Sequence, residues 1–147
     1  MRHEITTTIS VAAPPERVWS VLLAFARYPE WNPFVRSIEG QASEGSVISV
    51  TIQSPMGKVM SFRPVILRNS AGRELRWKGK LMLEGIFDGE HYFCLAPSGA
   101  GSTEFTHGER FTGLLVPLLR GALDRDTRSG FEAMNRALKQ RVEQGGA

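Results

Sequence analysis

The middle of this chain limits its fold most strongly, because it is a succession of strand-like stretches joined only by short turns. Parallel strands need crossover connections of about a dozen residues or more, and none of the turns is long enough to hold one. The region therefore predicts an antiparallel meander. Its six predicted strands cover residues 34–39, 46–54, 58–68, 73–80, 83–95 and 102–112.

The two ends of the chain add one strand and several helices to this meander. Residues 3–11 predict a strand, because apolar side chains alternate along them. Pro14 and Pro15 suit the first turn of a helix, and the prolines within residues 27–33 indicate a second, very short helix or a turn. In the last third, apolar residues recur every three or four positions, which predicts one long helix. Its stripe consists of Leu119, Leu123, Thr127, Phe131, Met134, Leu138 and Val142.

This order of elements predicts an α+β fold in which all 147 residues form a single domain. A seven-stranded antiparallel sheet must bury one of its faces, and the C-terminal helix is the only predicted element large enough to cover it. We therefore expect a curved sheet wrapped around that helix, with two short helices after the first strand. A gap between the concave sheet and the helix is the natural place for a ligand.

Composition excludes several classes of function. The single cysteine excludes a disulfide framework and a four-cysteine zinc site. A net charge of +3 is too small for a dedicated nucleic-acid binder. There is no glycine-rich phosphate loop and no His-Glu-x-x-His motif, so we expect neither a cofactor nor a metal. The start of the chain lacks the apolar core of a signal peptide, and no apolar run could span a membrane, which predicts a cytoplasmic location without integral membrane association.

Several short segments of the chain form a set that is typical of one protein family. The most specific are Val18-Trp19 and the Tyr-Pro-Glu-Trp-Asn-Pro segment at 28–33, and the others lie at 85–87, 91–93, 103–109 and 134–139. Together they resemble the SRPBCC superfamily, most closely its small polyketide cyclase/dehydrase-like members. The resemblance covers essentially the whole chain. It implies the helix-grip fold of START and birch-pollen-allergen proteins, with a hydrophobic cavity between sheet and helix. The superfamily contains binders, carriers and enzymes, so the fold does not choose among them.

The strand period of two predicts which residues face such a cavity. In 83–95 and 102–112 the odd-numbered residues form the more apolar set, which we assign to the inner face. Residues 58–68 allow two registers, and we favour the one that turns the aromatic Phe62 inward. Gly130 allows the sheet or a ligand to approach the helix closely. Each residue of the predicted lining has an alternative interpretation as ordinary core. That lining consists of Trp31, Phe34, Phe62, Trp77, Leu81, Phe87, Phe93, Phe111, Gly130 and Met134.

The same registers place three polar residues on the inner face, namely His91, His107 and Glu109. Each taken singly is typical of a hydrogen-bonded core group, and Glu109 would also suit a wet site or a pair with an arginine. Three on neighbouring strands favour a functional cluster, because burial shifts the pKa of such groups toward values useful in proton transfer. They are our candidate catalytic residues, although the same groups would also grip the polar end of an apolar ligand.

Three hypotheses follow for the function. The leading one is the binding or carriage of a hydrophobic small molecule, such as a lipid, quinone or polyketide-like compound. The second is a cyclase or dehydratase that uses Glu109 with His107 or His91 as acid and base. The third is a surface interaction through the basic C-terminal helix, although its mixed charges are more typical of a solvated face. The sequence gives no indication of the oligomeric state.

Overall fold

The computed structural model describes residues 2–81 and 85–145, except for the side chains of residues 81, 120, 122 and 123. The chain begins with β1 (Arg2–Val11), followed by α1 (Pro15–Leu23), a 3-10 turn at Phe25–Arg27 and α2 (Tyr28–Trp31). The strands that follow are β2 (Val35–Glu39), β3 (Ser49–Gln53), β4 (Val59–Phe62), β5 (Val65–Ser70), β6 (Glu74–Leu81), β7 (Phe87–Pro97) and β8 (Thr103–Thr112). The chain then continues through α3 (Val116–Ala122), a π-helical turn at Leu123–Thr127 and α4 (Arg128–Glu143).

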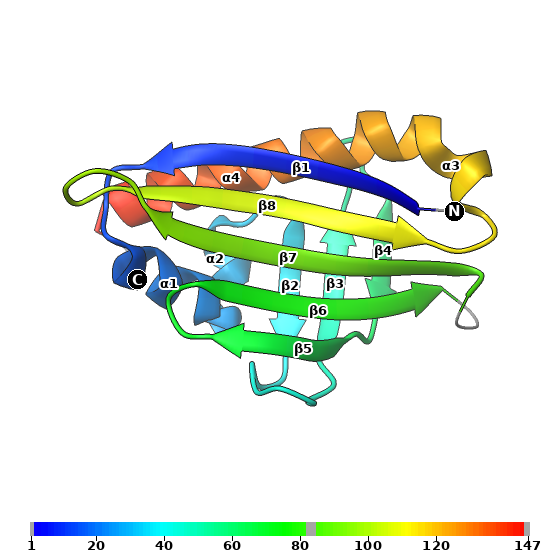
Figure 1. Cartoon of the computed structure of the whole chain (residues 1–147), viewed down its shortest axis with the longest axis horizontal. Coiled ribbons are helices and arrows are strands. Elements are labelled where there is room, and N and C mark those ends of the chain that lie inside the picture. The colour runs from blue at the N-terminus through cyan, green and yellow to red at the C-terminus, as the bar shows by residue number, and fades with distance from the viewer. Residues whose placement is uncertain (1, 82–84, 146–147) are drawn as a thin grey trace.

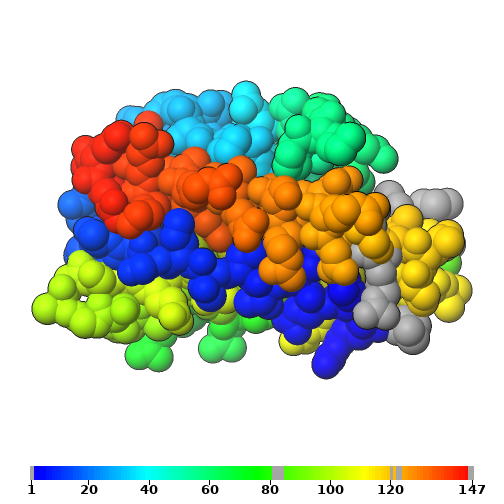
Figure 2. All heavy atoms as spheres, turned by 90° about the horizontal axis from the view of Figure 1, so that it is seen from above, coloured from blue at the N-terminus to red at the C-terminus, as the bar shows by residue number. Residues whose placement is uncertain are grey.

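The strands form two antiparallel sheets that lie in separate layers (Figure 1). The larger sheet has five strands in the order β1-β8-β7-β6-β5, and the smaller has three in the order β2-β3-β4. Seen from above, the C-terminal helix lies between the two layers along one side (Figure 2). The predicted α+β helix-grip architecture is confirmed. The strand count differs from the prediction, because the described residues contain eight strands in two sheets rather than seven in one.

The difference arises at Pro64, where the predicted strand over residues 58–68 divides into β4 and β5. Proline has no N–H to donate to a strand ladder, so the strand is interrupted there. The Pro64 carbonyl instead accepts a hydrogen bond from the backbone of Ile48 at 2.9 Å, and a single bridge between Val47 and Val65 also links the two sheets. Ile66 is buried and Val65 is exposed, as expected for the register that we favoured.

The C-terminal helical segment runs as predicted but contains the wider π turn. The predicted stripe begins with three successive steps of four residues, from Leu119 to Phe131. At 3.6 residues per turn, those twelve residues would rotate the stripe by about 120° away from the sheet. A π turn accommodates about one extra residue and so reverses most of that rotation. The later members of the stripe, Phe131, Met134, Leu138 and Val142, are fully buried.

Candidate functional site

A continuous chain of hydrogen bonds crosses the inner face of the five-stranded sheet. It begins at Glu109, whose Oε1 lies 3.1 Å from Nδ1 of His91. Nε2 of His91 lies 2.8 Å from Nε2 of His107, and Nδ1 of His107 lies 2.9 Å from Oδ1 of Asn135. The amide of Asn135 donates to the Thr7 hydroxyl at 2.8 Å. That hydroxyl donates to the His107 carbonyl at 2.9 Å and closes the chain on the backbone.

Strand register brings these residues together. His91 on β7 lies directly opposite Glu109 on β8. His107 is two residues before Glu109 and therefore points to the same face, where Thr7 of β1 is its partner across the ladder. Asn135 reaches the cluster from α4. The structure thus joins all three predicted polar residues and connects them to two that the sequence analysis did not identify.

Burial changes along this chain. The side chain of Glu109 is 18% exposed, whereas that of His91 is 6% exposed and His107 is completely buried. Asn135 and Thr7 are buried as well. Only the Glu109 end is therefore placed where a ligand or solvent can reach it.

Aromatic rings enclose the two histidines. The His107 ring stacks on Phe131, with centroids 4.0 Å apart, and the His91 ring stacks on Trp77 at 5.1 Å. Phe93 contacts both imidazoles, with a centroid distance of 4.8 Å to His107. Hydrogen bonds in such an apolar setting are strong, and a polar group left unpaired there is costly.

Burial lowers the pKa of His107 well below its ordinary value, and the neighbouring His91 lowers it further. Hydrogen bonds to Asn135 and to the backbone of Phe131 act in the opposite direction, but they are weaker than these two causes. His107 is therefore a neutral imidazole at physiological pH.

The position of the Glu109 carboxylate depends on a glycine. A Cβ atom added to Gly89 would overlap the carboxylate of Glu109. Gly89 lies opposite Gly79 of β6, beside which the ring of Phe62 packs. The two glycines leave a patch of sheet without side chains next to the one accessible end of the polar chain. Gly89 thus makes room for the acid.

Most of the predicted lining residues lie around this patch and the histidines. Trp77, Phe93, Phe111 and Met134 are buried, and Phe87 stacks on Phe111 with centroids 5.6 Å apart. The prediction for Leu81 concerns a side chain outside the described part of the chain.

Gly130 does allow a close approach to α4, and the group that approaches is the ring of Phe34. A Cβ at Gly130 would collide with that ring, which also packs edge-on against Phe131 at 5.5 Å. Phe34 and Gly130 therefore pack against each other, so a side chain rather than a ligand occupies this part of the predicted lining.

Trp31 does not join the cluster. It packs on Tyr28 with centroids 5.1 Å apart and borders a hollow of about 320 Å³ between α2 and α4. A larger hollow of about 690 Å³ lies between α1, the β5–β6 turn and the end of β7, where Trp19 and Leu95 line it. Neither hollow includes a residue of the polar chain.

The sequence pattern around Asn135 and Thr7 indicated that both are buried. Asn135 lies four residues after Phe131 and three before Leu138, so it shares the buried stripe of the helix. Thr7 alternates with Ile5, Ile9 and Val11 on the inner face of its strand. A polar residue at a buried position needs a hydrogen-bond partner, which would have directed attention to both.

The two imidazoles face each other through Nε2 atoms at hydrogen-bond distance, which is unsuitable for joint metal ligation. Across residues 2–81 and 85–145, no group of three or more His, Cys, Asp or Glu side chains is arranged to hold a metal ion. No helix in the same ranges is both long enough and apolar enough to cross a membrane.

Comparison with known proteins identifies the family. The sequence profile of the family described as polyketide cyclase / dehydrase and lipid transport matches residues 2–143. The chain belongs to this family. The resemblance to the SRPBCC superfamily is thereby confirmed. No curated protein sequence matches the chain.

Solved structures share the fold at low sequence identity. An aromatase/cyclase from Streptomyces sp. R1128 superposes with a TM-score of 0.79 at 18% identity, over 100% of both chains. A START superfamily protein from Mycobacterium smegmatis has a TM-score of 0.73 at 21% identity, over 97% of this chain and 98% of that one. Norcoclaurine synthase from Thalictrum flavum has a TM-score of 0.75 at 13% identity, over 100% of this chain and 90% of that one. At these identities the similarity shows the fold alone.

Proposed function

We propose that the protein is an acid–base enzyme of the cyclase or dehydratase type. Its substrate is an apolar, carbonyl-bearing small molecule, such as a polyketide-like compound, and Glu109 is the group that exchanges a proton with it. The observation that carries this proposal is the buried chain of hydrogen bonds that ends at the partly exposed Glu109 carboxylate. Membership of the family described as polyketide cyclase / dehydrase and lipid transport, and a structural neighbour named as an aromatase/cyclase, support it.

The polar chain favours chemistry over passive binding. Buried polar groups stabilise a core only when every one of them is paired, and an apolar lining would hold an apolar ligand without that constraint. Here two histidines, an amide and a hydroxyl are all buried to hold a single carboxylate in place. Groups held in this way are typical of proton transfer.

Dehydration of a β-hydroxy carbonyl compound illustrates the chemistry that the pair of Glu109 and His91 can perform. A base removes the proton from the carbon beside the carbonyl, and an acid protonates the departing hydroxyl, which leaves as water while a carbon–carbon double bond forms. The proton taken up equals the proton given back, so the pair returns to its starting state. General acid–base catalysis of this kind is worth about 10²–10⁴-fold in rate.

The test is Glu109→Gln, assayed on a panel of 1,3-diketones and β-hydroxy ketones with aryl substituents. We expect turnover to fall by about 10²–10⁴-fold, with substrate affinity nearly unchanged because the amide keeps the shape of the side chain. Glu104→Gln is the matched control, since Glu104 lies on the same strand but is exposed. Equal turnover in the Glu109 variant and the wild type would remove the acid–base assignment.

Carriage of a hydrophobic molecule without reaction is the second candidate, favoured by the aromatic side chains that surround the patch at Gly79 and Gly89. Native mass spectrometry of the purified protein would then show an extra mass that is released on denaturation. Gly79→Leu fills the patch beside Phe62 and should abolish that binding. Retained binding in this variant would place the ligand elsewhere.

A further inference from the structure

We infer that the buried hydrogen bonds run in one fixed direction, that Glu109 and His91 hold one proton between them, and that Asn135 and Thr7 are the positioning residues that set this arrangement. The location of the proton follows from hydrogen-bond geometry together with the burial of His107. Its use on a substrate rests on the proposed function.

The direction originates at the backbone. A carbonyl oxygen only accepts hydrogen bonds, so the single hydroxyl proton of Thr7 points to the His107 carbonyl. The Thr7 oxygen must therefore accept from Asn135, which places the Asn135 NH₂ group toward Thr7. The reversed amide would bring two oxygen atoms together at 2.8 Å with no proton between them. The orientation of Asn135 is thus determined.

The orientation of Asn135 determines the tautomer of His107, its neighbour in the chain. Because the Asn135 oxygen accepts, Nδ1 of His107 must carry a hydrogen. A neutral imidazole has one N–H, so Nε2 of His107 is left with a lone pair. The complete burial of His107 holds it in this neutral form, because a charged imidazolium would lose its hydration there.

The proton count at Glu109 then follows. Nε2 of His91 must donate to Nε2 of His107 across 2.8 Å. If His91 were neutral and Glu109 ionised, the Nδ1 lone pair of His91 would face a carboxylate oxygen at 3.1 Å. One further proton removes this repulsion, either on His91 as an imidazolium beside a carboxylate or on Glu109 as a carboxylic acid. The pair is electrically neutral in both forms.

The surroundings of the pair favour the same count. The contacts described around the pair come from uncharged side chains, namely Trp77 from β6, Phe93 from β7, Phe131 from α4 and the neutral His107 from β8. None of these groups would balance a lone carboxylate. An uncompensated charge in a largely buried site is costly, and the shared proton avoids it.

This arrangement deepens the proposed function, because it makes the pair a proton donor before it is an acceptor. Once Glu109 and His91 have protonated a substrate oxygen, the carboxylate and the imidazole lone pair repel each other, which favours removal of a proton from another atom of the same substrate. The substrate class is therefore a neutral compound that both accepts and loses a proton, such as a β-hydroxy ketone.

The test is heteronuclear NMR of the full chain labelled with ¹⁵N in histidine and ¹³C in glutamate. The sequence has three histidines, and His3→Gln removes the third signal, because His3 pairs with Asp124 and takes no part in the polar chain. We expect His107 to carry its hydrogen on Nδ1 and His91 to carry one on Nε2. We also expect either a protonated Nδ1 on His91 or a protonated Glu109 carboxyl. A neutral His91 beside an ionised Glu109, or a His107 protonated on Nε2, would overturn the inference.

Variants test the positioning role. Thr7→Ser keeps the hydroxyl and should keep the wild-type tautomers, whereas Thr7→Val frees Asn135 to turn over and should give mixed tautomers of His107. Asn135→Asp should reverse the direction, because a carboxylate favours a protonated His107, which then donates to Nε2 of His91. A merely structural role would change stability in these variants but leave the tautomers intact. If His107 keeps its wild-type tautomer in Thr7→Val, Thr7 and Asn135 are not positioning residues. This result decides the question even if Asn135→Asp fails to fold.

The two proposals fail separately. If the expected tautomers are found but Glu109→Gln retains full turnover, the acid–base function is wrong and the proton inference stands. If turnover collapses in Glu109→Gln but His91 is neutral beside an ionised Glu109, the inference is wrong and Glu109 acts as a simple base.

Discussion

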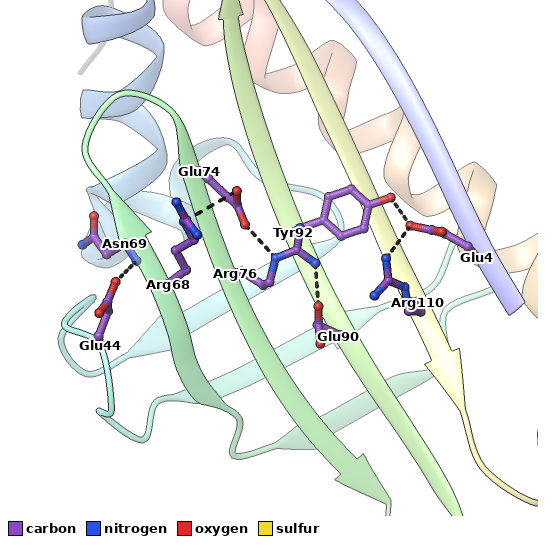
Figure 3. A network of polar contacts seen from close by, with 9 residues as sticks. All are labelled: Glu4, Glu44, Arg68, Asn69, Glu74, Arg76, Glu90, Tyr92 and Arg110. Carbon is purple, nitrogen blue, oxygen red and sulfur yellow. Dashed lines mark hydrogen bonds and ion pairs between the residues drawn. The ribbon is translucent and has the colours of Figure 1, made fainter. Parts of the chain in front are cut away.

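The two faces of the five-stranded sheet each carry a polar network, and the networks follow opposite principles. On the outer face, Arg76 is held between Glu74 and Glu90 at 2.7 and 2.6 Å, and its guanidinium lies over the ring of Tyr92 (Figure 3). The Tyr92 hydroxyl donates to Glu4 on β1. The charged groups of this network are part-exposed. If one of the two acids beside Arg76 is lost, the guanidinium still pairs with the other. On the inner face, each bond in the chain joins one donor to one acceptor, and apart from the backbone of Phe131 beside His107 the contacts described offer no second partner.

This difference shows what burial requires of a polar network. Solvent near the outer face can replace a lost partner, so each pair there contributes little. On the inner face, the removal of one partner leaves another buried group without any hydrogen bond. In a buried network of this kind the donor and the acceptor of each hydrogen bond are also determined. An exposed network with alternative partners has no such requirement. We therefore expect mutations on the two faces to differ in size and in kind.

The largest expected effect follows removal of a central member of the inner chain. His107→Leu keeps an apolar side chain against Phe131 but leaves the Asn135 oxygen and the His91 Nε2–H unpaired. Each orphaned group costs about 1–3 kcal/mol, so the free energy of unfolding should fall by about 2–6 kcal/mol for the two together. Urea denaturation measures this, with Glu104→Gln as the surface control. A loss no larger than that of the control would contradict the comparison between the faces.

Gly108 on the outer face and Gly89 on the inner face test whether mutations on the two faces affect different properties, stability on one and turnover on the other. An alanine Cβ at Gly108 would collide with the ring of Tyr92 and would lie 2.8 Å from the backbone oxygen of Ile5, which cannot move aside. We expect Gly108→Ala to lower the free energy of unfolding by about 1–3 kcal/mol. Gly89→Ala meets only the flexible end of Glu109. It should change stability by less than about 1 kcal/mol but reduce turnover, because the carboxylate is displaced.

Denaturation and activity assays on both glycine variants separate these outcomes. If Gly89→Ala is the less stable of the two and remains fully active, the inner glycine serves the fold rather than the site. Wild-type stability in Gly108→Ala would mean that Tyr92 need not lie across β8.

The inner network should also make stability depend on pH. Burial lowers the pKa of His107 in the folded chain, whereas in the unfolded chain the pKa is about 6.5. Below that pH His107 takes up a proton in the unfolded state but stays neutral in the folded state, so the free energy of unfolding falls as the pH decreases. The contribution is complete above about pH 6.5 and is lost toward lower pH with a slope of at most about 1.4 kcal/mol per pH unit.

Unfolding free energies measured at a series of pH values, for the wild type and for His107→Phe, isolate this contribution. The difference between the two curves should shrink as the pH falls through the region below 6.5. His3→Gln serves as the control, since His3 pairs with Asp124 and lies outside the inner network. A constant difference across the acid range would mean that His107 is protonated in the folded protein.

Much of this site was predictable because strands have a strict period. Alternation alone placed His91, His107 and Glu109 on the inner face, and their register across β7 and β8 follows from the pairing of those strands. The contacts of Asn135 were not predictable to the same degree, because a helix can rotate about its axis. The π turn before α4 rotates the helix in this way, and the rotation determines which helix residues contact the sheet.

Side-chain packing was the other part that the sequence did not reveal. Gly130 indicated a close approach, but period and composition do not specify that the approaching group is Phe34, which comes from a distant segment of the chain. Pro64 was visible as a proline within a strand pattern, yet its effect was to divide one strand between two sheets. Such features depend on contacts between segments, whereas burial on a strand depends on local alternation.

The smallest expected effect lies on the outer face, and it is the sharpest check of the comparison. Glu90→Gln removes one of the two acids beside Arg76 and leaves the bond to Glu74 at 2.7 Å in place. Ion pairs that solvent reaches contribute about 0.2–1 kcal/mol and are screened by salt, and the side chains of Arg76 and Glu90 are 21% and 25% exposed. The variant should therefore unfold within about 1 kcal/mol of the wild type at low ionic strength, and the difference should shrink further at high salt. Urea denaturation at two salt concentrations measures both. A larger loss that salt does not alter would mean that Arg76 depends on both acids, and that the outer network is as intolerant of change as the inner one.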